Sequence, residues 1–142
     1  MSDTPKHSVS VAGIVVDDLD RVLVIQRRDN HQWEPPGGVL EIDESPHDGV
    51  QREIREETGM LVEVQNLTGV YKNMKHGIVA LVFRCSAAGG NAQPTAESRQ
   101  VRWIPADEVK RSMNPAFAIR VLDALSGAGV AVRTHDGVEI IP

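Results

Sequence analysis

Three glutamates stand close together in the segment REIREETGM, residues 52–60. If this segment is helical, Glu53 and Glu57 are i,i+4 neighbours and Glu53 and Glu56 are i,i+3 neighbours, so the three carboxylates share one face. Like charges at that spacing oppose the helix by roughly 0.2–0.5 kcal/mol per pair. Arg52 can pair with Glu56, which leaves Glu53 and Glu57 uncompensated. Either water screens these carboxylates or a cation binds among them.

Carboxylates in this arrangement suit a hard divalent cation. Mg²⁺ prefers oxygen ligands and commonly bridges a few carboxylates to substrate phosphates, and Mn²⁺ accepts the same kinds of ligand. A bound ion lowers the pKa of water and neutralises phosphate oxygens, which favours hydrolysis of a phosphoanhydride. Gly37 and Gly38 carry no side chain, so backbone carbonyls there can approach the ion. The chemistry indicated is therefore metal-assisted hydrolysis.

The glutamates need a helix to hold them, and the sequence marks both of its ends. Ser45 and Pro46 match an N-cap followed by proline at the first helical position. Gly59 is the expected left-handed stop. Val50 and Ile54 provide an apolar stripe at i,i+4 spacing, so the acidic and apolar faces are distinct.

The remaining elements are predicted as a mixture of strands and helices. Residues 27–38 hold two prolines and two glycines and are expected to form a loop. The tail, residues 127–142, is expected to form a hairpin extension with Asp136 and Gly137 in a two-residue type I′ turn. Such an order of elements suggests a sheet covered by helices on its faces. Strands are expected at 8–16, 21–26, 61–73, 77–87 and 98–105, and further helices at 105–113 and 115–127.

Composition limits the classes of protein. The 142 residues suit a single domain, 1–142. A net charge of −5 without a long lysine or arginine run argues against a nucleic acid polymer as partner. No apolar run approaches the roughly 20 residues of a membrane span, and the polar start lacks a signal-peptide pattern, so a cytoplasmic protein is expected. The single cysteine, Cys85, is expected to be a buried, inert thiol.

The spacing of residues 38–60 resembles the signature of the Nudix hydrolases, the MutT-like family. Every defined position of that signature is filled, and the segment WEPPGG and the strand with Trp103 stand where similar proteins have theirs. The resemblance implies an α/β fold of the Nudix type, an α/β/α sandwich whose mixed β-sheet is flanked by helices. The matching positions are Gly38, Glu44, Arg52, Glu53, Ile54, Glu56, Glu57, Gly59 and Met60.

The resemblance also implies roles for these residues. It assigns metal binding to Glu53, Glu56 and Glu57, with a backbone oxygen such as that of Gly37 as a further ligand. Arg52 is expected to hold one of these carboxylates in place.

The resemblance says less about the remaining site residues. Glu44 is expected to fix the loop before the helix or to support the metal ligands from outside. The general base is either a glutamate of the helix or Glu97 from a later loop. Glu97 is a candidate metal ligand or base, and the alternative for it is a solvated surface position. Arg27 meets either a substrate phosphate or a surface ion pair.

The function expected is Mg²⁺-dependent hydrolysis of a nucleoside diphosphate linked to another group. The short chain favours a nucleoside triphosphate, ordinary or oxidised. ADP-ribose or another nucleotide sugar, and dinucleoside polyphosphates, stay open. A non-catalytic nucleotide-binding module is the alternative class, although such a module is expected to have lost signature residues. The tail hairpin leaves a homodimer open, because it can cap its own sheet or pair with a neighbour's edge.

Overall fold

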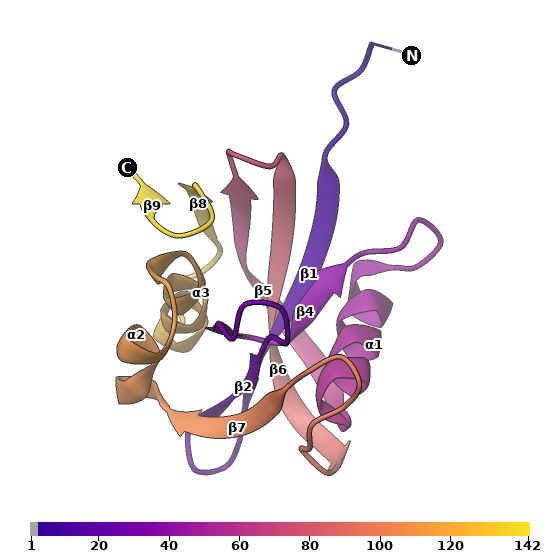
Figure 1. Ribbon diagram of the computed structural model, residues 1–142, viewed down its shortest axis with the longest axis vertical. Helices are drawn as coiled ribbons and strands as arrows, with labels where there is room; N and C mark the ends of the chain where they lie inside the picture. The colour runs from indigo at the N-terminus through magenta and orange to yellow at the C-terminus, as the bar shows by residue number, and fades with distance from the viewer. Residues whose placement is uncertain (1–2) are drawn as a thin grey trace.

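The computed structural model describes residues 3–142, which form one mixed nine-stranded sheet with helices on both faces (Figure 1). This arrangement confirms the predicted α/β class with helices flanking a mixed sheet. The strands are β1 (Ser8–Val16), β2 (Arg21–Gln26), β3 (Trp33–Glu34), β4 (Gly37–Val39), β5 (Met60–Asn73), β6 (Ile78–Gly90), β7 (Gln100–Pro105), β8 (Ala131–His135) and β9 (Ile140–Ile141). The helices are α1 (Pro46–Thr58), the 3₁₀ turn η1 (Ala106–Glu108), α2 (Val109–Ser112) and α3 (Pro115–Ser126).

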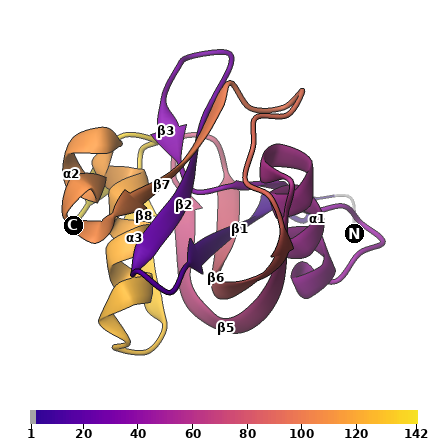
Figure 2. The same cartoon turned by 90° about the horizontal axis from the view of Figure 1, so that it is seen from below.

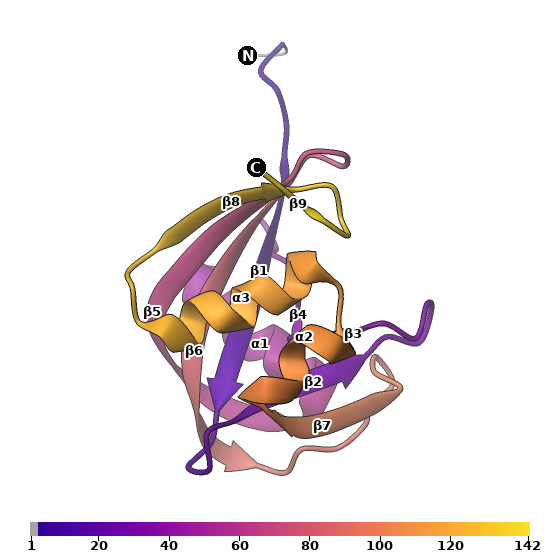
Figure 3. The ribbon, with the colours of Figure 1, turned by 90° about the vertical axis from the view of Figure 1, so that its left-hand side faces the viewer.

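The strand order is β3-β2-β1-β6-β5-β8-β9, with β4 added to β1 and β7 added to β2. The pairs β1–β6 and β5–β8 are parallel, and the other pairs are antiparallel. Helix α1 covers one face, and α2 and α3 cover the other (Figure 2). Figure 3 shows α3 lying across β5, β6 and β1 on the face opposite α1.

Strand β1 is the centre of the sheet and is buried on both faces. Val11 and Val15 pack in the cluster that includes the apolar side of α1, whereas Ala12 and Ile14 pack in the cluster beneath α3. Successive side chains of a strand point to opposite faces. Because helices cover both faces, β1 reads as a near-continuous apolar run rather than an alternating one.

The second edge of β1 is shared between two strands, and this sharing positions the glycine loop. Strand β4 pairs with residues 10–12, whereas β2 pairs only where Val16 lies opposite Val22. A Cβ on Gly37 would collide with the carbonyl oxygen of Val11 and with Ala12. The absence of a side chain therefore lets β4 lie against the central strand.

Two expectations for the loops and ends need correction. The segment 27–38 contains β3 and the start of β4 rather than loop alone, because short backbone pairings with β2 and β1 order it. The tail turn is also not type I′. Residues 136–139 separate the paired His135 and Ile140, and Asp136 Oδ1 accepts hydrogen bonds from the N–H groups of Val138 and Glu139, at 2.9 and 2.8 Å. The carboxylate satisfies these amides, so a four-residue turn replaces the two-residue one.

The tail joins the sheet of its own chain, since β8 pairs in parallel with β5. A carboxylate on α3 fixes this arrangement. Asp123 accepts hydrogen bonds from the hydroxyl of Tyr71 on β5, at 2.7 Å, and from Nε and Nη2 of Arg133 on β8, both at 2.8 Å. Burial opposes ionisation of Asp123, but these hydrogen bonds outweigh it and lower its pKa. Asp123 therefore joins α3 to two strands.

Two further properties concern single features. Cys85 is buried, as expected, and burial raises the pKa of its thiol to about 12, which makes it unreactive. Within residues 3–142, every helix is too short or too polar to cross a bilayer.

We expect Asp123→Asn to lower the free energy of unfolding by about 1–3 kcal/mol, because charge-assisted hydrogen bonds are lost. The folded pKa of Asp123 lies below its ordinary value of 3.8, so the stabilisation is present above that value and is lost as pH falls through the folded pKa. Urea titrations at pH 7 and pH 3 measure both effects. Asp18→Asn, at an exposed turn position, is the control. Equal stability of wild type and Asp123→Asn at pH 7 would contradict the assignment.

Candidate active site

Helix α1 presents the acidic residues, and its ends form as the sequence predicts. The hydroxyl of Ser45 accepts a hydrogen bond from the N–H of Asp48 at 3.1 Å. Gly59 ends the helix with a φ of 77°. Val50 and Ile54 are fully buried and fix the opposite side of the helix on the sheet. The acidic side is thereby held above β4.

Arg52 is the centre of the charge network on this helix. Its Nε and Nη2 atoms donate to the two oxygens of Glu44, at 2.9 and 2.5 Å. Its Nη1 atom donates to Glu53 at 2.9 Å and to Glu56 at 3.2 Å. The expectation that Arg52 leaves Glu53 uncompensated is therefore wrong, because one guanidinium has donors enough for three carboxylates. The hydrogen bond from Arg52 lowers the pKa of Glu44 to about 2.

Glu57 lies outside this network. Its Oε1 atom accepts a hydrogen bond from the N–H of Gly37 at 2.7 Å, and within residues 3–142 no cationic side chain forms an ion pair with it. Burial raises the pKa of Glu57 to about 8 and also raises the pKa of Glu53, although Arg52 opposes the shift of Glu53. Burial therefore favours the protonated form of Glu57 in the metal-free protein, and a positive charge nearby would favour the carboxylate.

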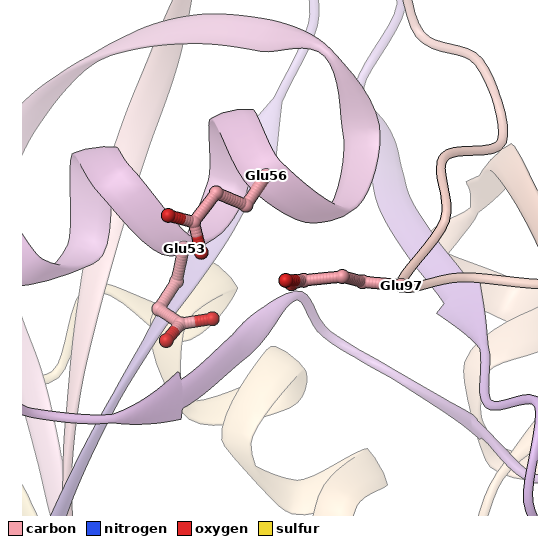
Figure 4. Close-up of side chains that lie close together, drawn as sticks. All are labelled: Glu53, Glu56 and Glu97. Carbon is pink, nitrogen blue, oxygen red and sulfur yellow. The ribbon is translucent and has the colours of Figure 1, made fainter.

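Glu97 comes to this site from the loop before β7. One oxygen each of Glu53, Glu56 and Glu97 lie within 4.8 Å of one another (Figure 4). The hydroxyl of Ser98 is fully buried and donates to the carbonyl oxygen of Glu57 at 2.6 Å. This hydrogen bond ties the loop to the end of α1. The sequence left Glu97 open as a site residue, and the structure brings it beside two helix glutamates.

The space next to these carboxylates depends on a glycine. A Cβ on Gly38 would lie 2.6 Å from the carboxylate of Glu53. Oxygen-only donors gathered in this way fit a hard divalent cation such as Mg²⁺. Glu53, Glu56 and Glu97 could hold the ion directly, with Glu57 and the backbone of Gly37 close by.

Arg27 forms the ion pair that the sequence left open, and its contact with a substrate phosphate stays a prediction. It forms an ion pair with Asp29, with contacts of 2.8 and 2.7 Å, and a longer one of 3.4 Å with Glu34. The hydrogen bonds that it donates to these carboxylates raise its pKa. It also lines the same cleft as Glu57 and Glu97. An arginine held by acidic neighbours at the cleft can meet a phosphate group.

A second cavity, of about 190 Å³, lies beside the carboxylates and contains residues that sequence reasoning missed. Glu34, Arg120 and His135 line it, and each is at most 9% exposed. One sequence signal was available for Arg120, because it interrupts the otherwise apolar segment AFAIRVL of α3. Glu34 and His135 gave no such signal, since only tertiary packing buries them.

The comparisons with known proteins agree with this geometry. The family model described as NUDIX domain matches residues 6–125. The chain is 59% identical over 138 residues to a "MutT-like protein" of Streptomyces ambofaciens, covering 97% of this chain and 90% of that protein. It is 29% identical over 116 residues to a "Putative 8-oxo-dGTP diphosphatase" of Bacillus subtilis, covering 81% and 78%.

Two further comparisons concern a sugar-nucleotide enzyme and a solved structure. The chain is 30% identical over 104 residues to an "ADP-ribose pyrophosphatase" of Methanocaldococcus jannaschii, covering 68% of this chain and 61% of that protein. A crystal structure of a NUDIX hydrolase from Nitrosomonas europaea aligns with a TM-score of 0.79 at 22% identity, covering 93% of this chain and 81% of that one. The chain belongs to the Nudix family. It is thus a hydrolase of phosphoanhydrides, of the class that uses divalent metal ions.

The raised pKa of Glu57 predicts a pH effect on the metal-free protein. Its folded pKa is about 8 and its ordinary value is 4.5, so between these values the folded state binds a proton that the unfolded state has lost. Stability must therefore fall as pH rises through this window, on the order of a few kcal/mol.

We expect Glu57→Gln to remove that part of the pH dependence, because the amide is neutral and can still accept from Gly37. Urea titrations in EDTA at pH 5, 6.5 and 8 measure it. Parallel pH profiles for wild type and variant would show that the burial of Glu57 does not shift its pKa.

Proposed function

We propose that the protein hydrolyses a phosphoanhydride in a nucleoside diphosphate linked to another moiety, with Mg²⁺ as cofactor and Mn²⁺ as a substitute. The supporting observation is the convergence of Glu53, Glu56 and Glu97 within 4.8 Å, in a chain of the Nudix family. When bound there, a divalent ion neutralises phosphate oxygens and lowers the pKa of water. An acidic helix face that only met solvent would require neither Gly38 beside Glu53 nor a loop tied down by Ser98.

One group of residues is assigned to binding the metal ion and to supporting its ligands. Glu53, Glu56 and Glu57, with the Gly37 backbone, are assigned to metal binding. Arg52 donates hydrogen bonds to Glu53 and Glu56 and so holds them in position. Glu44 in turn accepts two hydrogen bonds from Arg52 and holds it in place. Such supporting contacts orient the metal ligands and raise the affinity of the site for the metal ion.

Substrate contacts and proton transfer are assigned to the other residues of the cleft. Arg27 is assigned to a substrate phosphate, and Gly38 leaves space for it. Glu97 and Glu57 are the two candidates for the base that accepts the proton of the attacking water, because both line the cleft with Arg27. Their different environments make them distinguishable by mutation.

A nucleoside triphosphate, ordinary or oxidised, is the substrate class we place first. The relative named for 8-oxo-dGTP aligns over more of this chain than the relative named for ADP-ribose. ADP-ribose, other nucleotide sugars and dinucleoside polyphosphates are the alternatives. A non-catalytic nucleotide-binding module is disfavoured because the described site retains all of its acidic residues and Arg52.

A substrate panel tests this function. We expect nucleotide and phosphate release from nucleoside triphosphates with Mg²⁺ and none with EDTA. Chromatography of products from triphosphates, ADP-ribose and dinucleoside polyphosphates, at equal concentration, identifies the class. Glu53→Gln is expected to reduce turnover by more than the roughly 10–100-fold loss typical of supporting residues, whereas Glu63→Gln, on the exposed side of β5, retains it. Undiminished turnover by Glu53→Gln would remove the metal assignment.

The general base is tested by Glu97→Gln and Glu57→Gln. Loss of a general base typically costs roughly 10²–10⁴-fold in rate. If Glu97 is the base, Glu97→Gln removes the acidic limb of the kcat pH profile while Mg²⁺ still binds. If Glu57 is the base, Glu57→Gln does so instead. Measurement of kcat from pH 5.5 to 9.5 at saturating Mg²⁺ separates the two, and an acidic limb unchanged in both variants would exclude both residues.

A further inference from the structure

Arg120 on α3 is a buried cation that lacks an acceptor. Its side chain is 7% exposed, and its Nε atom has no hydrogen-bond partner. The rings of Phe117 and Tyr71 lie over the guanidinium, with centroids 4.8 and 5.1 Å from Cζ. Within residues 3–142, no carboxylate or carbonyl oxygen accepts from Arg120. Burial lowers its pKa to about 10, so it stays charged at neutral pH.

Among residues 3–142, the side chain within hydrogen-bond distance of this guanidinium is His135, and it does not supply an acceptor. Arg120 Nη2 lies 3.3 Å from His135 Nε2. His135 Nδ1 accepts a hydrogen bond from the N–H of Gly137 at 2.9 Å, so a neutral ring carries its proton on Nε2. The N–H groups of Arg120 Nη2 and His135 Nε2 then face each other, and neither accepts. Leaving a buried charged donor without an acceptor costs several kcal/mol, which indicates that a ligand supplies the acceptor.

Glu34 contributes a carboxylate, which is an acceptor, to the lining of the same cavity. It is 9% exposed, and burial raises its pKa, although its attraction to Arg27 and to Arg120 opposes this shift. Phe117, Ala12 and Pro35 supply apolar lining to the same cavity. A phosphate or carboxylate here would meet the carboxylate of Glu34. The cavity therefore suits a neutral, flat group that has both acceptors and donors on its edge.

The cavity adjoins the cleft of the carboxylates, because Arg27, Glu34 and Gly37 line both. A substrate with its phosphates near Glu53 and Glu97 can therefore place its base beside Arg120. The cavity has a volume of about 190 Å³, which is below the roughly 300–1,000 Å³ of sites that enclose a whole ligand. The cavity can therefore accommodate only one end of the substrate.

We propose that Arg120 and Glu34 select a guanine base, an inference that rests on the proposed nucleotide hydrolase function. Guanine presents two neighbouring acceptors, O6 and N7, which match the paired donors of an arginine. Its N1–H and N2 amino donors follow on the same perimeter and match a carboxylate. Adenine places an amino donor where guanine has O6, so it would set a donor against Arg120. Oxidation at C8 puts a hydrogen on N7, so the unoxidised base is the one this pair prefers.

The test compares GTP, ATP and 7-deaza-GTP, which lacks the N7 acceptor, as substrates of the full chain with Mg²⁺. We expect kcat/KM for GTP to exceed that for ATP by roughly 5–150-fold, the discrimination of one bidentate contact, with 7-deaza-GTP between them. Arg120→Met should abolish this preference, and Arg102→Met, which removes an arginine stacked on Trp33, should keep it.

A stability measurement separates recognition from a structural role. Removing an unpaired buried charge should leave the Tm of Arg120→Met equal to or above that of wild type. Equal loss of activity on GTP and ATP with a lowered Tm would assign Arg120 to structure and overturn the proposal. Should Arg120→Met fail to fold, Glu34→Gln is the second variant, and its unchanged preference for GTP would equally overturn it.

A binding measurement keeps this inference separate from the proposed function. Calorimetry with GMP and AMP in EDTA needs no catalysis. Tighter binding of GMP, lost in Arg120→Met, would support the pocket even if no triphosphate were hydrolysed. Equal binding of the two nucleotides, or none of either, would overturn it.

Discussion

The crowding of carboxylates around α1 is the constraint on which the rest of the structure depends. Arg52 is shared by Glu44, Glu53 and Glu56, and Glu57 has only a backbone amide. Repulsion between such groups opposes folding unless positive charge reaches them. The packing of Val50 and Ile54 holds the helix in place against this repulsion. The acidic site thus lowers the stability of the metal-free protein, a cost that is common at functional sites.

The surrounding elements serve to bring other groups to this helix. Strand β4 lies on β1 because Gly37 has no side chain, and it carries the amide that meets Glu57. The loop before β7 is fastened by Ser98, which places Glu97 near Glu53. A second unpaired charge lies in the adjoining cavity that Gly37 and Gly38 also line, where Arg120 is a buried cation without an acceptor among residues 3–142. A divalent ion that carries the phosphates of a nucleotide would neutralise the carboxylates, and the base of the same nucleotide would supply an acceptor to Arg120.

The sequence predicted the parts of this structure that depend on local signals. Ser45, Pro46 and Gly59 marked the ends of α1, and β-branched runs marked the long strands. It could not predict which distant residues meet. Glu97 was an open candidate because its position depends on a buried hydroxyl 41 residues from its partner. Arg120 and Glu34 were missed because their burial arises from tertiary packing, and the tail turn was wrong because Asp136 caps its amides.

The central claim is that a divalent ion binds among these carboxylates. Electron paramagnetic resonance of free Mn²⁺, titrated into metal-free protein, measures this binding without any substrate. We expect saturable uptake of Mn²⁺ by the wild type, competed by Mg²⁺, strongly weakened in Glu53→Gln and Glu56→Gln, and unchanged in Glu63→Gln. Equal uptake by all four proteins, or none by the wild type, would contradict the account.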